Sequence, residues 1–376
     1  MTDFPPDDFG DEGAGFGIGS AHVAADRRRG RGAGSNATGR FERFATLPVD
    51  DGWPIDDPLP PLRTEVAVER PRSIITRNSS PDLPFDRSVN PYRGCEHACI
   101  YCYARPTHAF LGLSPGLDFE TKLIARPDAA KLLEEELRRT SYRPAPIAFG
   151  TNTDPYQPIE KSREIMRDCL RVLSDFNHPL TITTKGTLVE RDIDLLAPMA
   201  AKNLVEVGIS VTTLNPQIAR VMEPRVPTPA RRLTTIRKLA DAGIPVRIMA
   251  SPLIPALTDH ELEAILQAGA DAGATRAAYI LVRLPLEVAD LFRDWLEEHF
   301  PDRAARIMGR IRALHGGQDY KADFGTRFGG QGEWAKLTSA RFAVALRKIG
   351  LVREVAPLRI DLFAPPFARG AQLSLF

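Results

Sequence analysis

The sequence predicts an α/β protein built on a parallel sheet, and three observations support this class. Short runs rich in apolar and β-branched residues alternate with segments in which apolar residues recur at helical spacing. Strands separated by helices are expected to run parallel, because each helix returns the chain to the same edge of the sheet. The chain has 376 residues, of which 43% are apolar, and this is enough for a sizeable core. The length fits two to three domains or one large α/β domain with appended segments.

The alternation of strands and helices begins near residue 86. The expected strands cover residues 89–93, 146–150, 180–184, 204–211, 245–250 and 277–282. The helices expected between them cover residues 128–140, 160–176, 191–202, 230–242 and 259–272. Six such units are two short of a closed eightfold barrel. We therefore expect a partial (βα)6 TIM-like barrel over residues 61–285.

The two ends of the chain differ from this central part. Residues 1–60 are rich in glycine, proline and mixed charge, and they predict a flexible, disordered tail. Residues 286–376 predict a mostly helical extension. Its helices are expected at 287–300, 303–314 and 333–349, with a glycine-rich loop before the last of them.

Charge and hydropathy limit the classes of function. The net charge is +1, so the whole chain carries no electrostatic footprint for nucleic acid, and such binding would need a local patch. No window approaches the ~18 apolar residues of a membrane span. The acidic, proline-rich N-terminus is unlike a signal peptide. We expect a cytoplasmic protein without membrane contact.

Cysteine is scarce and clustered. Cys95, Cys99 and Cys102 have the spacing C-x3-C-x2-C directly after the first expected strand, and Cys169 is far away. A secreted disulfide framework would be denser and more evenly spread. Thiolates this close together favour a metal site, because they are soft ligands for zinc, Cu(I) and iron–sulfur clusters.

The ligand count separates two kinds of metal site. Structural zinc requires four ligands, and His97 and His108 are the nearby candidates for the fourth. A [4Fe–4S] cluster is ordinarily held by four cysteines, so three would leave one iron free to bind a substrate or cofactor.

This cysteine motif, with Tyr101 as the aromatic residue before the last cysteine, resembles the radical S-adenosylmethionine (radical SAM) superfamily. The segments 90–95 and 151–157 are similar to the subgroup that includes spore photoproduct lyase. The resemblance implies a [4Fe–4S] cluster on Cys95, Cys99 and Cys102 that binds S-adenosylmethionine and cleaves it reductively. The resulting 5′-deoxyadenosyl radical would abstract hydrogen from a substrate. It also implies a low-potential electron donor of the flavodoxin or ferredoxin type.

Further cofactor contacts are expected where the strands end, because ligands meet parallel strands at their carboxyl ends. The resemblance implies that segment 152–154 meets the methionine amino group and that a lysine and an arginine meet the carboxylate. The position of Tyr101 in the motif favours a contact with adenine. Ser210 and Thr212 share a face of their strand, because side chains alternate, and are expected to hydrogen-bond the ribose. The residues concerned are Tyr101, Asn152, Thr153, Asp154, Lys185, Ser210, Thr212 and Arg225.

Each of these residues also has a simpler structural interpretation. Asn, Thr and Asp form turns, lysine is often solvated at a strand end, and hydroxyls are common inside barrel strands. Arg225 could instead form a surface ion pair with Glu223, two residues before it.

One departure from the subgroup concerns the reaction. Spore photoproduct lyase uses a cysteine at the end of the second strand, and the matching residues 148–151 contain none. Cys169 falls on the apolar stripe of an expected helix, where a buried cysteine acts as a small hydrophobe. The superfamily resemblance therefore does not extend to photoproduct repair.

The sequence predicts a radical SAM enzyme with an unassigned substrate, acting in DNA repair or maintenance. Modification of RNA, a protein or a small metabolite is the second enzyme hypothesis, and a metal-cluster interaction protein is the non-enzyme hypothesis. The C-terminus links the first hypothesis to DNA, because its last residues resemble the peptide with which bacterial replication and repair proteins bind the DNA sliding clamp. The residues that match are Gln372, Leu373, Leu375 and Phe376. Packing of this peptide on its own barrel is the alternative.

Overall fold

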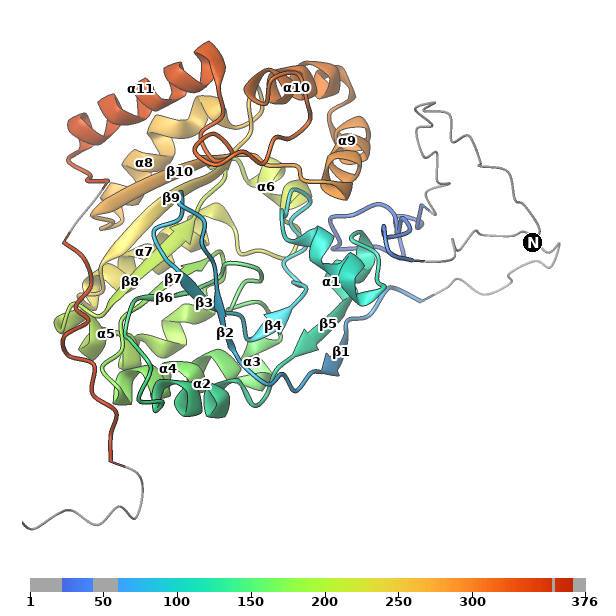
Figure 1. Cartoon of the computed structure of the whole chain (residues 1–376). Coiled ribbons are helices and arrows are strands. Elements are labelled where there is room, and N and C mark those ends of the chain that lie inside the picture. Colours follow the sequence, from blue (N-terminus) through green and yellow to red (C-terminus); the bar gives the residue numbers. More distant parts are fainter. Residues whose placement is uncertain (1–21, 43–59, 354–355, 368–376) are drawn as a thin grey trace, which may run out of the picture.

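The computed structural model describes residues 22–42, 60–353 and 356–367. Its main sheet has seven strands in the order β10-β9-β8-β7-β6-β3-β2 (Figure 1). The strands are β2 (Ile75–Arg77), β3 (Arg87–Val89), β6 (Ile147–Phe149), β7 (Leu180–Thr184), β8 (Val205–Ser210), β9 (Val246–Leu253) and β10 (Arg276–Leu281).

Six of these strands run parallel in sequence order, from β3 to β10, and β2 joins β3 antiparallel. The sheet has two edges, β2 and β10, so it is an open partial barrel, as the sequence predicts. The prediction for residues 180–184 matches β7 in full, and the other five strands overlap their predicted ranges.

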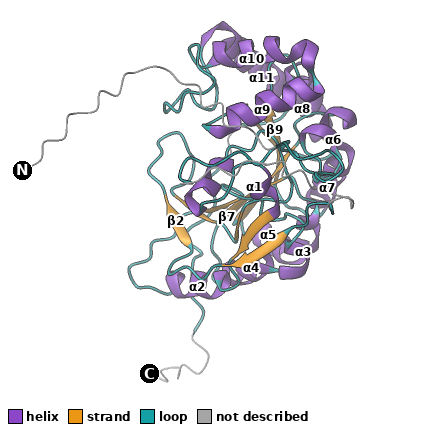
Figure 2. Ribbon diagram, turned by 90° about the vertical axis from the view of Figure 1, so that its right-hand side faces the viewer, coloured by secondary structure: helices purple, strands orange, loops and turns teal. Residues whose placement is uncertain are grey.

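Helices cover the outer side of the sheet, with α2–α5 at one end of the molecule and α8–α11 at the other (Figures 1 and 2). The helices that alternate with the strands are α2 (Ala129–Leu137), α3 (Glu160–Arg163), α4 (Ile165–Asp175), α5 (Ile193–Ala201), α6 (Pro216–Met222), α7 (Pro229–Asp241) and α8 (Leu262–Asp271). Three further helices follow the sheet, α9 (Glu287–His299), α10 (Pro301–Leu314) and α11 (Gly332–Ile349). Short 3-10 turns are η1 (Arg105–Leu111), η2 (Leu188–Asp192) and η3 (Asp259–Glu261).

The helix predicted over residues 160–176 is two helices, α3 and α4, separated at Glu164. Glu164 has a positive φ of 52°, which ends α3. The Glu160 carboxylate then accepts hydrogen bonds from the amides of Met166 (3.0 Å) and Arg167 (3.3 Å). These amides lie in the first turn of α4 and have no partner within the helix, so the side chain stabilises a second helix start.

A second sheet, in the order β1-β5-β4, flanks the cysteine loop. It consists of β1 (Glu65–Val68), β4 (Tyr92–Arg93) and β5 (Lys122–Ala125). The short helix α1 (Leu117–Thr121) leads directly into β5. The strand predicted over residues 89–93 is divided between the two sheets, with Val89 in β3 and Tyr92–Arg93 forming β4, whereas β1 and β5 are not predicted. These elements have two to five residues each, which is too short for hydrophobic periodicity to register.

Part of the predicted N-terminal tail is folded against the protein. The amides of Gly32 and Ala33 both donate to the buried Glu120 carboxylate at 2.9 Å, and Arg31 donates to the Glu120 carbonyl at 2.8 Å. A Cβ at Gly32 would lie 2.0 Å from the carbonyl oxygen of Ala98, within the cysteine loop. A flexible tail is therefore the wrong description of residues 22–42, because a buried carboxylate needs these donors. The remainder of the predicted tail, 1–21 and 43–59, lies outside the described residues.

The described C-terminal segment, residues 356–367, packs at the amino ends of β7 and β8. Phe363 lies 5.6 Å from the ring of Tyr142 and 5.4 Å from the ring of His178. The amide of Arg359 donates to the carbonyl of Asn203. Within the described residues, none of the helices combines the length and the apolar character that a membrane crossing requires.

Candidate functional site

The cysteine loop follows β4 directly and is fixed by backbone contacts. The Cys95 amide donates to the carbonyl of Phe119, and the Ile100 amide donates to the carbonyl of Met222. Gly94 precedes the loop with φ +74°, and a Cβ there would lie 2.8 Å from Leu123 and 2.9 Å from the Phe119 carbonyl oxygen. The chain therefore needs glycine before Cys95 to turn and to approach its neighbours this closely.

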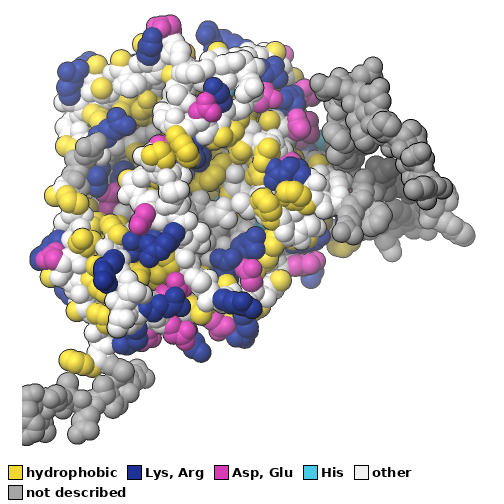
Figure 3. Space-filling view, viewed as in Figure 1, with side chains coloured by type: hydrophobic (Ala, Val, Ile, Leu, Met, Phe, Trp, Pro, Cys, Tyr) yellow, Lys and Arg dark blue, Asp and Glu magenta, His cyan; other side chains and the backbone are white. Residues whose placement is uncertain are grey.

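The three clustered cysteines line one pocket together with the carboxyl ends of the neighbouring strands. Segments 150–154 after β6 and 183–185 at the end of β7 form one wall, and Ser210 at the end of β8 forms another. The face drawn in Figure 3 is hollowed near its centre, and hydrophobic and Lys or Arg side chains gather around this hollow. The lining residues that carry functional side chains are Cys95, His97, Cys99, Cys102, Tyr103, Thr151, Asn152, Thr153, Asp154, Thr183, Thr184, Lys185 and Ser210.

The loop after β6 holds the cysteine loop in place. Thr153 Oγ1 donates to the Gly94 carbonyl at 2.6 Å, and Gln157 Nε2 donates to the same carbonyl at 3.2 Å. Gln157 Oε1 accepts from the amide of Glu96 at 2.9 Å. Gln157 is thus a positioning residue that the sequence did not single out, because its partners lie about sixty residues away in the chain.

Asp154 connects the loop after β6 to the end of β7 in the same pocket wall. Its carboxylate accepts from the Thr184 hydroxyl (2.6 Å) and from the amides of Lys185 (2.8 Å) and Tyr156 (2.9 Å). His97 Nδ1 lies 3.2 Å from Asp154 Oδ2. Burial by itself raises the pKa of Asp154, but His97 and these hydrogen bonds outweigh it and lower the pKa to about 2. The carboxylate is therefore ionised and already surrounded by donors of the chain.

Asn152 differs from its two neighbours in this segment. The side chains of Thr153 and Asp154 form hydrogen bonds within the protein. The side chain of Asn152 has no hydrogen-bond partner among the described residues. Its backbone amide donates to Asn90 Oδ1 at 3.0 Å, which fixes the loop without using the side chain. Of the three predicted acceptors for an ammonium group, Asn152 is the one free to bind a ligand.

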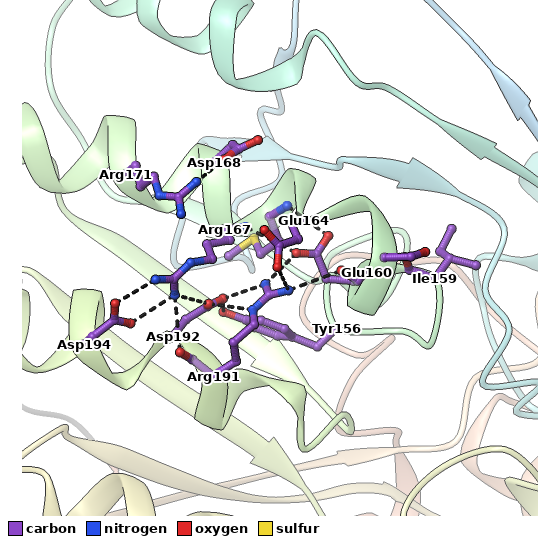
Figure 4. Close-up of polar contacts among 12 residues, drawn as sticks. Tyr156, Ile159, Glu160, Glu164, Arg167, Asp168, Arg171, Arg191, Asp192 and Asp194 are labelled. Atoms are coloured by element: carbon purple, nitrogen blue, oxygen red, sulfur yellow. Dashed lines mark hydrogen bonds and ion pairs between the residues drawn. The ribbon is translucent and has the colours of Figure 1, made fainter.

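A largely buried ionic network contacts this loop through Tyr156 (Figure 4). The Tyr156 hydroxyl donates to Asp192 Oδ2 at 3.1 Å, and Asp192 also accepts from Arg167 (2.7 Å) and Arg191 (2.8 Å). Arg191 additionally donates to Glu160 at 2.7 Å. These contacts tie the loop to α3, α4 and the start of α5, so the pocket wall is anchored to the helical layer.

Lys185 lines the pocket as a cation. Its Nζ lies 5.7 Å from the centre of the Tyr101 ring, a distance that allows a cation–π contact. Burial alone lowers the pKa of Lys185, but the nearby charges of Cys99, Glu223 and Asp154 raise it above its ordinary value. The ammonium form is therefore stable in the pocket and suits an anionic ligand group.

Tyr101 lies behind the pocket wall in a network that sequence analysis missed. Its hydroxyl donates to Glu223, which also accepts from Arg232 Nη2 at 2.6 Å. Arg232 Nη1 donates to the Ser210 carbonyl at 2.8 Å. Thr212 is fully buried beside the same carboxylate. Glu223 and Arg232 come from separate elements, so only the fold reveals that they pair.

Arg225 does not pair with Glu223, so the surface-pair alternative is wrong. Its guanidinium lies 3.1 Å from Glu96 Oε1, which also accepts from the Thr64 hydroxyl at 2.5 Å. Glu96 is in the cysteine loop, so Arg225 links the connection between α6 and α7 to that loop. Glu223 is unavailable to Arg225 because its carboxylate is buried against Arg232.

The structure thus brings most of the predicted site residues together. The residues of the predicted set that line the pocket are Cys95, Cys99, Cys102, Asn152, Thr153, Asp154, Lys185 and Ser210. Tyr101, Thr212 and Arg225 are not among the residues that line it. His108 is also away from the pocket, with Nε2 3.0 Å from the Lys122 carbonyl oxygen.

The thiols suit a cluster better than a single ion. Within the described part of the chain, no group of His, Cys, Asp and Glu converges on one metal ion. In a [4Fe–4S] cluster each thiolate binds a different iron, so the sulfurs need not converge. The three thiols are unbridged, and Cys95 and Cys99 are buried. Burial, Asp154 and the neighbouring thiols raise the pKa of Cys95. Binding to iron would remove the cost of ionising these crowded thiols, so the donor set fits a cationic cluster.

Cys169 lies elsewhere, fully buried on α4. Burial raises the pKa of its thiol, which keeps it protonated and unreactive. Besides the three clustered residues, no described cysteine lines the pocket.

Comparison with known proteins gives consistent results. The family model of the radical SAM superfamily matches residues 89–268. An uncharacterised protein of Mycobacterium tuberculosis is 40% identical over 235 residues, which are 62% of this chain and 68% of that protein. An uncharacterised protein of Methanocaldococcus jannaschii is 28% identical over 217 residues, which are 57% of this chain and 76% of that protein.

Among solved structures, a spore photoproduct lyase mutant with bound AdoMet and dinucleoside spore photoproduct is similar to this chain. The TM-score is 0.55, and the match covers 77% of this chain and 80% of that chain at 15% sequence identity. The structural match shows that the two proteins share a fold, and at 15% identity it shows no more than the fold.

Proposed function

Because the chain belongs to the radical SAM superfamily of [4Fe–4S] and S-adenosylmethionine enzymes, we propose that Cys95, Cys99 and Cys102 hold the cluster and that the protein acts on DNA. The observation that carries the proposal is the single pocket in which these cysteines face Asn152, Lys185 and Ser210. When bound, the cluster and S-adenosylmethionine supply a 5′-deoxyadenosyl radical for hydrogen abstraction.

The residues of the chain bind and orient the cofactor in this proposal. The free amide oxygen of Asn152 accepts from the methionine ammonium, and the Lys185 ammonium pairs with the carboxylate. Ser210 hydrogen-bonds the ribose at the end of β8. Tyr101 and Arg225 are positioning residues, since each contacts a partner that fixes the pocket wall. Thr212 is buried beside Glu223, and its hydroxyl has no hydrogen-bond partner among the described residues. Asp154 and Thr153 hold the Asn152 segment in place.

The DNA assignment has two supports. One is the likeness in fold to a lyase whose solved structure contains a dinucleoside photoproduct. The other is the C-terminal sequence that resembles a clamp-binding peptide. RNA, protein and small-metabolite substrates are the competing classes. The absence of a fourth cysteine among the described pocket residues argues that the reaction differs from photoproduct repair.

The test is anaerobic reconstitution with iron and sulfide, followed by dithionite and S-adenosylmethionine. We expect 5′-deoxyadenosine, detected by chromatography, and a stimulation of its formation by DNA. No 5′-deoxyadenosine from a fully reconstituted protein would overturn the catalytic role. Stimulation by RNA or peptide in place of DNA would overturn the substrate assignment. We also expect a reduced flavodoxin or ferredoxin to support the reaction in place of dithionite, because radical SAM enzymes need a reductant.

Clamp binding is the second part of this proposal. The peptide Gln372, Leu373, Leu375 and Phe376 lies outside the described residues. The described chain before it ends at Phe367, which is 79% exposed, at the amino ends of the strands. The pocket is at the opposite, carboxyl end of the sheet. A clamp bound to this terminus would therefore leave the pocket accessible.

We expect the full-length protein to bind purified sliding clamp at about the micromolar level, or about −8 kcal/mol, in a calorimetric titration. A chain ending at Ala371 should not bind, because it lacks the leucine and phenylalanine anchors, which are worth roughly 1.5–3 kcal/mol each. Both proteins should melt at the same temperature. If truncation lowered the melting temperature and the intact protein did not bind clamp, the peptide would be a structural latch.

A further inference from the structure

Aromatic rings and guanidinium groups alternate in a row at the mouth of the pocket. The Arg327 guanidinium lies 4.9 Å from the centre of the Phe324 ring and 4.7 Å from that of Phe328. The Arg283 guanidinium lies 4.7 Å from Phe328 and 4.1 Å from Tyr103. We call these five residues, in the order Phe324, Arg327, Phe328, Arg283 and Tyr103, the aromatic–arginine row.

The row runs from the protein surface to the cysteine pocket. Phe324, at one end, has 59% of its surface exposed. Tyr103, at the other end, lines the pocket, and its hydroxyl donates to the Thr151 carbonyl in the pocket wall. A ligand that followed the row would therefore reach the site of hydrogen abstraction.

The glycine-rich loop between α10 and α11 is fixed across the open side of the barrel (Figure 1). The Leu281 amide on β10 donates to the Phe328 carbonyl at 2.9 Å. Arg327 forms two hydrogen bonds, of 2.6 and 2.8 Å, with Asp82 in the connection between β2 and β3. The loop thus contacts both edges of the sheet, so the row is a built surface rather than a chance gathering of side chains.

The two arginines differ in how their charge is compensated. Arg327 is neutralised by Asp82. Arg283 has no carboxylate partner among the described residues, and its contacts are the rings of Tyr103 and Phe328. A planar cation held between two rings keeps its edge donors for an anion such as a phosphodiester.

We propose that the aromatic–arginine row binds a single-stranded nucleic-acid segment, with an unpaired base stacked on the exposed ring of Phe324 and a phosphate on the edge of Arg283. Bases of single strands stack on aromatic rings and arginine planes, while cations contact the backbone. A short local row also agrees with a net charge of +1, which leaves the rest of the surface without a basic footprint. The inference rests on the proposed function and deepens it by naming the substrate class.

The test measures binding of a fluorescein-labelled, mixed-sequence single-stranded DNA of about 15 nucleotides, by anisotropy under anaerobic conditions. Phe324→Ala should raise Kd by roughly five- to hundredfold, which corresponds to about 1–3 kcal/mol for one lost stack. Arg283→Gln should weaken binding and reduce the slope of log K against log salt by about 0.7, the value for one phosphate contact on a single strand. An RNA strand of the same sequence shows which of the two nucleic acids is preferred.

Phe367→Ala is the matched control for Phe324→Ala, because Phe367 is exposed on the opposite end of the barrel. Arg171→Gln is the control for Arg283→Gln, because Arg171 is an exposed arginine on α4. Neither control should change Kd. Equal binding by Phe324→Ala, Arg283→Gln and the unchanged protein would overturn the proposal, as would equal affinity for duplex and single strand or preference for an acidic peptide.

The 5′-deoxyadenosine formed without nucleic acid is measured in the same preparations. If no preparation forms 5′-deoxyadenosine while the row variants still lose DNA binding, the proposed function is wrong. The proposal that the aromatic–arginine row binds nucleic acid is then still supported. If 5′-deoxyadenosine forms normally while the row variants bind DNA as tightly as the unchanged protein, only the proposal that the row binds nucleic acid is wrong.

Discussion

Cys95→Ala, Cys99→Ala and Cys102→Ala are each expected to abolish cluster assembly and the formation of 5′-deoxyadenosine. The unchanged protein should bind about four irons per chain after anaerobic reconstitution. Removal of one thiolate leaves a second iron without a protein ligand, in a pocket whose other walls offer no replacement thiol among the described residues. Iron analysis, the visible absorption of the cluster and chromatography of the products measure the loss.

Cys169→Ala is the matched control for this series. Its thiol is fully buried among the apolar residues of α4 and its neighbours, so the substitution removes one small buried group and no ligand. Iron content and product formation should equal those of the unchanged protein. Loss of the cluster in Cys169→Ala, or its retention in any of the three other variants, would refute the assignment of the ligands.

Glu223→Ala should destabilise the fold by roughly 3–5 kcal/mol, because it leaves the buried guanidinium of Arg232 without its carboxylate. Glu223 and Arg232 are both nearly inaccessible to solvent and lie 2.6 Å apart. The Tyr101 hydroxyl would lose its acceptor in the same variant. Urea denaturation followed by circular dichroism measures the free energy of unfolding.

Glu263→Ala provides the comparison, since Glu263 also forms two hydrogen bonds with an arginine, Arg341, but is 46% exposed. An exposed pair is worth about 0–1 kcal/mol, so this variant should unfold almost as the unchanged protein does. Replacing both Glu223 and Arg232 by leucine should recover part of the stability lost in Glu223→Ala. If Glu223→Ala and Glu263→Ala lost the same free energy of unfolding, burial would not strengthen the contribution of the Glu223–Arg232 pair to stability.

Local sequence patterns were sufficient for the barrel strands and for the cysteine motif. Strand β7 matches its predicted range because five apolar or β-branched residues stand between clear breaks. The strand-end rule led to Asn152, Lys185 and Ser210, which the structure places in one pocket with the cysteines. Whether they bind the cofactor stays a prediction.

Contacts between distant residues set the limit of sequence analysis. Gln157 reaches the cysteine loop from the loop after β6, and the Tyr101 hydroxyl reaches Glu223 across 122 residues of the chain. A single sequence contains no signal that pairs such positions. The same limit applies to residues 22–42, whose composition predicts a tail although Gly32 and Ala33 satisfy a buried carboxylate.

The contact between the N-terminal segment and Glu120 has a consequence for how the protein can be divided. Glu120 also pairs with Arg105, which donates two hydrogen bonds to the Cys99 carbonyl at 2.9 and 3.1 Å. A series of contacts thus runs from Gly32 through Glu120 and Arg105 to the backbone of Cys99, a proposed cluster ligand. The region that the family model matches, 89–268, excludes both Gly32 and β10, so it lacks a donor to Glu120 and an edge strand of the main sheet. Expression of that region alone would remove the outermost support of the iron-binding loop.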